Sequence, residues 1–315
     1  MMTATKPISS AGGVEVLGID LSAPPKDAGE LVELFDQHGL LLFREQPMTK
    51  AVLLAASRMF GEPLVHLLGH NNDREVPEVA VVSTRGRDGD IEAKDPDELV
   101  GRIEWHTDQA YTPSPNRATM MWAVELPPEG GETGFVDREK VYEAMPASLR
   151  DRIDGLHVVQ SWRKAQAEIA KNPNYATDEG AKMLQLDRFP DLSYELVQRH
   201  PVTGRKVVHA PPMWSSAIVE LPGDEGTALL DEVMAFSLQP HFVYWHRYRP
   251  NDVVLWDNWR FMHAASGTKG RYRRLMYRTV LKGGAVMGVP LDPAESEAAE
   301  KRYRAAMQSA RAEAV

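Results

Sequence analysis

The sequence predicts a mainly β protein with flanking helices, an α+β fold in which two β-sheets form the core. Short apolar runs bounded by Gly, Pro or charged residues indicate many short strands, which we expect at 14–18, 40–43, 78–83, 118–124, 156–159, 241–246, 253–256 and 275–281. Apolar residues at helical spacing predict helices at 27–38 and 49–60, next to the first strands. Because the strands are short, separated by turns and flanked by N-terminal helices, the pattern favours two facing sheets over a parallel sheet.

Local signals support further elements. Thr49 and Asp137 are placed to cap helices that continue to residues 60 and 144, because their side-chain oxygens can accept hydrogen bonds from free backbone N–H groups. Another helix is expected at 224–237, and a hairpin at 196–209 around a Thr-Gly turn. Residues 161–192 are polar and broken by prolines, so we expect an insertion outside the core.

We expect one domain over residues 1–284, followed by an extension over 285–315. Within the domain, 1–13 is predicted to be a tail, and 85–101, rich in acidic residues and in Gly and Pro, a lid loop. In the extension, a helix is expected to begin at Asp292-Pro293. Its apolar stripe could pack on the core or on a second copy of the chain, so a homo-oligomer is among the expected assemblies.

Composition excludes several classes of function. The chain has 315 residues, 43% of them apolar, and no cysteine, so it cannot build a thiolate nucleophile, a disulfide or an iron–sulfur cluster. Its net charge of -9 and the lack of a Lys/Arg-rich run disfavour nucleic acid and anionic membranes as partners. No apolar run is long enough to span a membrane or to form a signal segment, so we expect a soluble, cytoplasmic protein.

A candidate metal site lies at His106 and Asp108. Residues i and i+2 of a strand point to the same face, so this imidazole and this carboxylate can converge on one ion. Two His and one carboxylate are typical of non-haem Fe(II). The motif alone leaves open a surface His beside an exposed Asp. His263, on a predicted strand far along the chain, can be the third ligand only if the fold brings the two strands together.

Two arginines on a late strand are candidates for binding anions. Arg274 and Arg278 are an even number of residues apart and share a face of the strand. A guanidinium inside a β core is costly unless a carboxylate meets it. The alternative is a pair of surface arginines, because Arg271 and Arg273 are close by. His66, in a loop, is by itself more typical of a capped or solvated histidine.

A set of longer motifs occurs in a characteristic order. They are Phe60-Gly61-Glu62, Trp105-His106-Thr107-Asp108, Gly130-Gly131-Glu132-Thr133, His200-Pro201-Val202-Thr203-Gly204, Trp256-Asp257-Asn258, His263, and Arg273-Arg274-Leu275-Met276-Tyr277-Arg278-Thr279. In order and spacing they resemble the taurine dioxygenase (TauD/TfdA) family of Fe(II)/2-oxoglutarate-dependent dioxygenases. The resemblance covers roughly residues 14–284 and implies a double-stranded β-helix, or jelly roll, as the core.

The resemblance assigns roles residue by residue. It makes His106, Asp108 and His263 the iron ligands. Thr133 and Arg274 stand where the family holds the distal carboxylate of 2-oxoglutarate.

Substrate contacts are implied at four further positions. Arg278 and His66 stand where the family contacts an acidic substrate, and Trp214 matches an aromatic position of the pocket. Arg102 replaces an asparagine of the taurine-cleaving members, and Gly69 replaces a tyrosine. Taurine itself is therefore not the expected substrate.

The implied activity is that of an enzyme with Fe(II) as cofactor and 2-oxoglutarate and O2 as co-substrates. It would hydroxylate a small organic anion and release succinate and CO2, and hydroxylation next to oxygen, sulfur or phosphorus would fragment the product. A desaturase or cyclase on the same scaffold is an alternative, as is a non-catalytic metal-binding jelly roll, which would lack an arginine such as Arg274. Because Arg278 has no carboxylate partner evident in the sequence, we expect it to bind the substrate anion, with His66 opposite.

Overall fold

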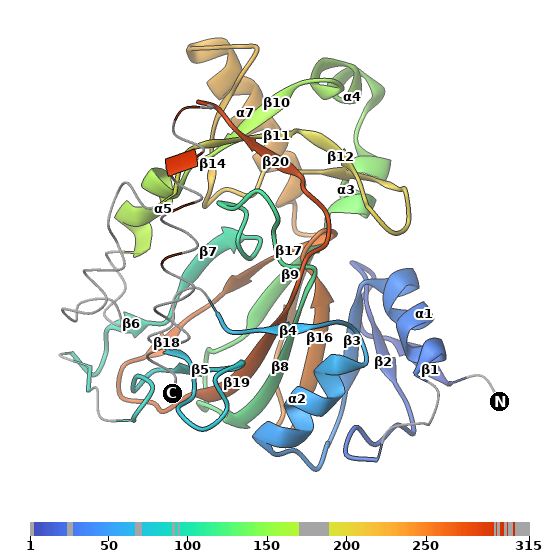
Figure 1. Ribbon diagram of the computed structural model, residues 1–315, viewed down its shortest axis with the longest axis vertical. Coiled ribbons are helices and arrows are strands. Elements are labelled where there is room, and N and C mark those ends of the chain that lie inside the picture. Colours follow the sequence, from blue (N-terminus) through green and yellow to red (C-terminus); the bar gives the residue numbers. More distant parts are fainter. Residues whose placement is uncertain are drawn as a thin grey trace.

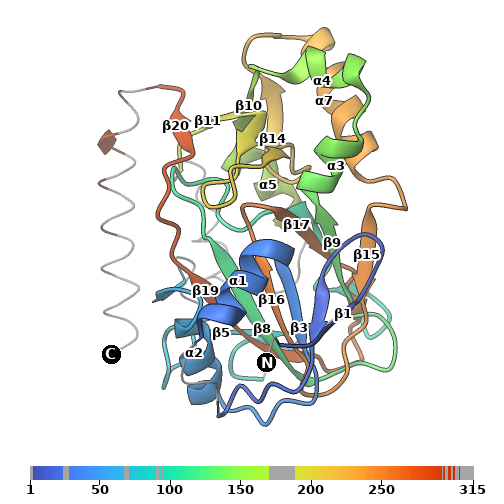
Figure 2. The same ribbon diagram turned by 90° about the vertical axis from the view of Figure 1, so that its right-hand side faces the viewer.

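The computed structural model describes residues 3–23, 28–66, 71–89, 92–93, 95–169 and 189–292, and the single positions 294, 297–298, 301 and 305. Two β-sheets, one larger than the other, pack face to face, and two helices lie against the outside of the larger one. Further helices and a third sheet lie at the other end of the molecule (Figures 1 and 2). This is the predicted class, mainly β with flanking helices. No described helix is both long and apolar enough to cross a membrane.

The larger sheet has eight strands in the order β1-β2-β3-β16-β8-β19-β4, with β5 also paired to β19. Its strands are β1 (Thr5–Pro7), β2 (Val14–Val16), β3 (Leu40–Phe43), β4 (Pro63–Leu64), β5 (Val79–Ser83), β8 (Ala118–Glu125), β16 (Val253–Asp257) and β19 (Leu275–Leu281). The expectation of a tail over 1–13 is wrong, because β1 pairs with β2 and extends this sheet.

The second sheet faces the first and has the order β15-β9-β17-β7. Its strands are β7 (Ile103–His106), β9 (Thr133–Asp137), β15 (Val243–His246) and β17 (Phe261–Ala265). Leu42 and Met121 from the larger sheet pack with Phe135 and Phe261 from the smaller one in a single buried cluster. Two mainly antiparallel sheets, with one parallel pair between β2 and β3, enclose one apolar interior and form the expected jelly roll.

Helices α1 (Gly29–His38) and α2 (Lys50–Arg58) cover the outer face of the larger sheet. Their apolar stripes, with Phe35 and Leu53, pack against strand residues such as Met120. The Thr49 side chain accepts a hydrogen bond from the Val52 N–H, which confirms the predicted cap. Burying the second face in this way explains why strands such as β3 are apolar throughout instead of alternating.

A layer of helices and short strands covers the outer side of the smaller of the two facing sheets. It contains α3 (Arg138–Ala144), α4 (Ala147–Ile153), α5 (Trp162–Ile169), α7 (Asp224–Ser237), the sheet β14 (Ser215–Ile218), β10 (His157–Gln160), β11 (Leu192–Glu195) and β20 (Gly288–Pro290), and the hairpin β12 (Val197–Arg199) and β13 (Lys206–Val208). Asp137 caps α3 as predicted, and the expected hairpin is present. Buried residues of this layer form one cluster with Val136 and Met262 of the smaller sheet.

The expectations for the stretch 161–192 and for the C-terminal extension change. Trp162 and Phe189, within the stretch 161–192 expected outside the core, are buried against other aromatic residues. The extension expected from residue 285 first contributes β20 to a sheet, whereas the helix expected from Asp292-Pro293, with its apolar stripe, lies largely outside the described residues. Near the end of the predicted lid, β6 (Leu99–Val100) pairs with β18 (Thr268–Lys269). Lid behaviour stays a prediction.

Candidate active site

The fold brings the three predicted metal ligands together. His106 ends β7 and is the register partner of His263 in β17, so the two rings are neighbours, with centroids 4.1 Å apart. Asp108 follows β7, and its Oδ1 is 3.8 Å from the Nε2 atoms of both His106 and His263. All three side chains are buried. Among the residues that the structure describes, this is the one group of three His or acidic side chains whose ligand atoms converge, within 4.8 Å of one another.

The imidazoles are oriented to use Nε2. His106 Nδ1 lies 2.7 Å from the Glu104 carbonyl oxygen, so it donates there and leaves the Nε2 lone pair facing the site. The His263 ring is fixed by packing, with ring centroids 4.9 Å from Trp256 and 6.5 Å from Phe135. Its Nδ1 has no hydrogen-bond partner among the described residues.

The site also stabilises the protonation states that a metal requires. Burial lowers the pKa of His106, and burial with the nearby His106 lowers the pKa of His263 well below its usual value, so both rings are neutral at pH 7. Burial alone would raise the pKa of Asp108. The charges of Arg278 and the two histidines and a hydrogen bond from Thr119 outweigh it, so the Asp108 pKa is lowered. Two neutral imidazoles, one carboxylate and no thiolate fit Fe(II).

A second cluster lies where 2-oxoglutarate is expected. Thr133 begins β9 and accepts a 3.0 Å hydrogen bond from the hydroxyl of Tyr248. The Arg274 guanidinium lies 5.9 Å from the Tyr248 ring centroid, and its Nε donates to the Gly131 carbonyl oxygen at 3.2 Å. Gly131 has a φ of 78°, and a Cβ there would lie 3.1 Å from Arg274 Cδ, so glycine leaves room for the arginine. Tyr248 was missed because it belongs to no motif.

Arg278 lies directly beside the triad. Its Nη1 is 3.7 Å from Asp108 Oδ1, a carboxylate that the sequence did not indicate as its neighbour. Its Nη2 is 3.1 Å from His66 Nε2. Because a guanidinium only donates, this nitrogen of His66 accepts, and the imidazole is neutral. His66 therefore contacts Arg278 directly and does not lie opposite it.

The remaining two predicted substrate residues differ in their surroundings. The Arg102 side chain is 66% exposed, and its Nη2 lies 3.9 Å from Glu104 Oε2. Trp214 is buried, and its Nε1 donates to the Thr107 carbonyl oxygen at 3.0 Å. Its ring belongs to an aromatic cluster with Tyr111, Trp162 and Phe189, which the sequence reasoning missed because these residues are far apart in the chain.

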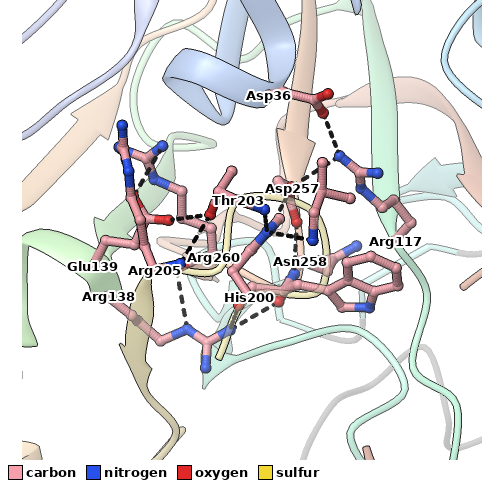
Figure 3. Close-up of polar contacts among 12 residues, drawn as sticks. Asp36, Arg117, Arg138, Glu139, His200, Thr203, Arg205, Asp257, Asn258 and Arg260 are labelled. Atoms are coloured by element: carbon pink, nitrogen blue, oxygen red, sulfur yellow. Dashed lines mark hydrogen bonds and ion pairs between the residues drawn. The ribbon is translucent and has the colours of Figure 1, made fainter. Parts of the chain in front are cut away.

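Buried charges hold the turn that leads from β16 to β17. Asp257 accepts hydrogen bonds from His200 Nε2 at 3.0 Å and from the Trp259 N–H at 2.9 Å, and Arg117 lies 3.5 Å away (Figure 3). The pKa of Asp257 is lowered, because the bond from His200 and the charges of His200 and Arg117 outweigh burial, which alone would raise it. Two of the sequence motifs, those around His200 and around Asp257, are therefore in direct contact.

A jelly roll with a buried His–Asp–His triad beside a buried Thr and a half-buried Arg defines a non-haem iron oxygenase. The family model described as "Taurine catabolism dioxygenase TauD, TfdA family" matches residues 4–280, and the chain belongs to this family. It is a 2-oxoglutarate-dependent dioxygenase that uses Fe(II).

Relatives of known activity match almost end to end. The chain is 30% identical to the alpha-ketoglutarate-dependent 2,4-dichlorophenoxyacetate dioxygenase of Cupriavidus pinatubonensis, over 88% of this chain and 96% of that protein. It is 28% identical to pentalenolactone F synthase of Streptomyces avermitilis, over 89% and 94%. The crystal structure of AAD-2 in complex with Mn(II) and N-oxalylglycine superposes with a TM-score of 0.77 at 26% identity, covering 91% of this chain and 100% of that one.

Proposed function

We propose that the substrate of this dioxygenase is a small organic anion whose charged group binds Arg278 beside His66. The iron would be held by His106, Asp108 and His263. The distal carboxylate of 2-oxoglutarate would bind Thr133 and Arg274, a division of labour that leaves Arg278 for the substrate.

The observation that carries the proposal is the incomplete pairing of Arg278. Its side chain is only 19% exposed, and its Nε has no hydrogen-bond partner among the described residues. Asp108 Oδ1, at 3.7 Å from Nη1, is beyond hydrogen-bond distance, and it shares its charge with the metal when it serves as a ligand. A half-buried guanidinium with few partners to replace its lost hydration is costly in free energy. A bound carboxylate, sulfonate, sulfate or phosphonate would therefore stabilise it.

The relatives support the same substrate class. The Cupriavidus enzyme acts on 2,4-dichlorophenoxyacetate, a carboxylate at neutral pH. An anion of this kind would give the Arg278 guanidinium in our chain its missing anionic partner and would leave the three triad residues in place.

The protein's own residues bind and orient the reactants. When bound, Fe(II) with 2-oxoglutarate and O2 supplies the oxidising chemistry that converts a C–H bond to C–OH and yields succinate and CO2. Because Arg278 Nη1 is 3.7 Å from Asp108 Oδ1, an anion on this guanidinium is held next to the triad, and the carbon atoms adjoining its charged group come closest to the reaction. Arg274 and Thr133 orient the co-substrate from the other cluster.

A succinate-release screen with charge-matched pairs tests the proposal. Sulfonates, sulfate esters, phosphonates, aryloxyacids and amino acids are each compared with a neutral amide or ester of the same shape. We expect turnover of at least one anion and a large loss for its neutral partner. Equal turnover of the neutral partner would show that no anion is required.

Arg278→Ala separates substrate binding from co-substrate binding. Loss of one partner of a desolvated charge pair costs on the order of 2–5 kcal/mol, or roughly 30- to several-thousand-fold in affinity. We expect the Km for the anion to rise by this factor, while the visible Fe(II)–2-oxoglutarate absorption band is retained. The exposed neighbour Arg273 provides the matched control, Arg273→Ala, which should change neither. An unchanged substrate Km in Arg278→Ala would refute the assignment.

One relative bears on the reaction outcome. Pentalenolactone F synthase is named for its product and not for a dioxygenation, which favours keeping desaturation or ring closure as a second candidate. Mass spectrometry of the product distinguishes them: hydroxylation adds one oxygen, whereas desaturation or ring closure removes two hydrogens.

A further inference from the structure

The two oxygens of the Asp108 carboxylate have different partners. Oδ2 accepts a 2.6 Å hydrogen bond from the hydroxyl of Thr119. Oδ1 instead faces the Nε2 atoms of both histidines of the triad, at 3.8 Å from each. The side chain is thus turned so that one oxygen points into the candidate metal site and the other points away from it.

The bond from Thr119 is the end of a chain of hydrogen bonds whose direction is fixed by its first member. Trp256 Nε1 can only donate, and it donates to Asn258 Oδ1 at 3.0 Å. The amide of Asn258 must then present its NH2 group to Thr119, and its Nδ2 lies 3.0 Å from Thr119 Oγ1. Because Thr119 accepts this bond, its own hydroxyl proton is available for Asp108.

The fold holds this hydrogen-bond chain rigidly. Trp256 and Thr119 are register partners on β16 and β8, and Trp256, Thr119 and Asn258 are all buried. Arg138 donates to the Asn258 and Trp259 carbonyl oxygens at 2.9 Å each, which fixes the turn that carries Asn258 (Figure 3). Trp256 also packs on the ring of His263, so one residue contacts one ligand and begins the chain that ends on another.

We propose that Trp256, Asn258 and Thr119 are positioning residues that fix Asp108 as a one-oxygen metal ligand through Oδ1. The proposal rests on the iron site proposed above. The end torsion of an aspartate is broad, so without the Thr119 bond the carboxylate is free to turn. It could then present both oxygens to the metal or move toward Arg278, whose Nη1 is already 3.7 Å from Oδ1. Either change would weaken metal binding without removing any ligand.

Mn(II) binding to the metal-free protein, without 2-oxoglutarate, tests the proposal independently of turnover. Free Mn(II) is measured by electron paramagnetic resonance. Thr119→Val keeps the shape of the side chain but removes the donor, and it should weaken Mn(II) binding by about 10- to 100-fold, the usual effect of losing a partner of a metal ligand. Thr119→Ser keeps the hydroxyl and should restore the wild-type affinity. Asn258→Ala should weaken binding in the same direction and by less.

Thr279→Val is the matched control. Thr279 is a buried threonine on β19 of the same sheet, and its hydroxyl lies 2.5 Å from Ser57 Oγ. Its replacement removes a comparable buried hydrogen bond and should lower the melting temperature while leaving Mn(II) affinity unchanged.

Several outcomes would overturn the proposal: wild-type affinity in Thr119→Val, no rescue by Thr119→Ser, or an equal loss of affinity in Thr279→Val. Should Thr119→Val fail to fold, Asn258→Ala decides the question, and unchanged Mn(II) binding there would refute it. If the iron-site proposal itself were wrong, Asp108→Ala would bind Mn(II) as tightly as the wild type does. This result would distinguish failure of the iron site from failure of the positioning role.

Discussion

Arg138 offers the sharpest test of how the fold supports the site. It begins α3, is 1% exposed, and donates five hydrogen bonds. The three shortest go to His209 Nδ1 at 2.7 Å and to the carbonyl oxygens of Asn258 and Trp259 at 2.9 Å each. Burial lowers the pKa of Arg138 to about 10, although nearby carboxylates raise it, so the side chain is still charged at pH 7.

Arg138→Met keeps an unbranched apolar stem and removes every donor. A buried acceptor left without a partner costs about 1–3 kcal/mol, so three of them cost about 3–9 kcal/mol. Proteins are stable by only about 5–15 kcal/mol, so the variant should be marginally stable or unfolded at 25 °C. Arg138→Lys retains a charge and fewer donors, and it should lose an intermediate amount.

Urea unfolding followed by circular dichroism measures the free energy of unfolding of both variants. The matched control is Arg152→Met, because Arg152 Nη1 forms an exposed ion pair with Glu232 at 2.7 Å. Exposed pairs contribute about 0–1 kcal/mol, so this control should stay close to the wild type. If Arg138→Met lost no more free energy of unfolding than Arg152→Met, the turn after β16 would not depend on Arg138.

Three further predictions concern the site and its protonation. Asp108→Ala should abolish 2-oxoglutarate-dependent succinate formation, because it removes the anionic ligand; normal turnover would contradict the ligand assignment. Arg274→Ala should lose the visible Fe(II)–2-oxoglutarate band before it loses substrate affinity, with Arg273→Ala as the unaffected control, and an intact band at limiting 2-oxoglutarate would disprove the co-substrate role. Burial, and then the charge of Arg138, lowers the pKa of His209 well below its usual value, so below about pH 6.5 the unfolded chain binds a proton that the folded chain does not. The free energy of unfolding of the metal-free protein should therefore fall as the pH drops from about 7.5 to about 5.5, and His209→Gln should reduce that slope by up to about 1.4 kcal/mol per pH unit; equal slopes for the variant and the wild type would count against it.

The sequence by itself determined the features that depend on neighbours along the chain. The apolar run at Leu40–Phe43, the caps at Thr49 and Asp137 and the helix Asp224–Ser237 follow from hydrophobic period and from free backbone N–H groups, both of which are local. The pairing of His106 with Asp108 is local as well. The third ligand and the co-substrate residues came from matching motifs, because nothing near His263 indicates which strand will lie beside it.

Only the tertiary structure decided which side chains meet across strands. Thr119 reaches Asp108, Tyr248 reaches Thr133, and Arg278 lies next to Asp108 because of the order and register of strands that are far apart in sequence. A shift of one residue in any pairing would turn these side chains to the opposite face of the sheet. Register is set by the packing of the whole core, so no local pattern in the chain encodes these contacts.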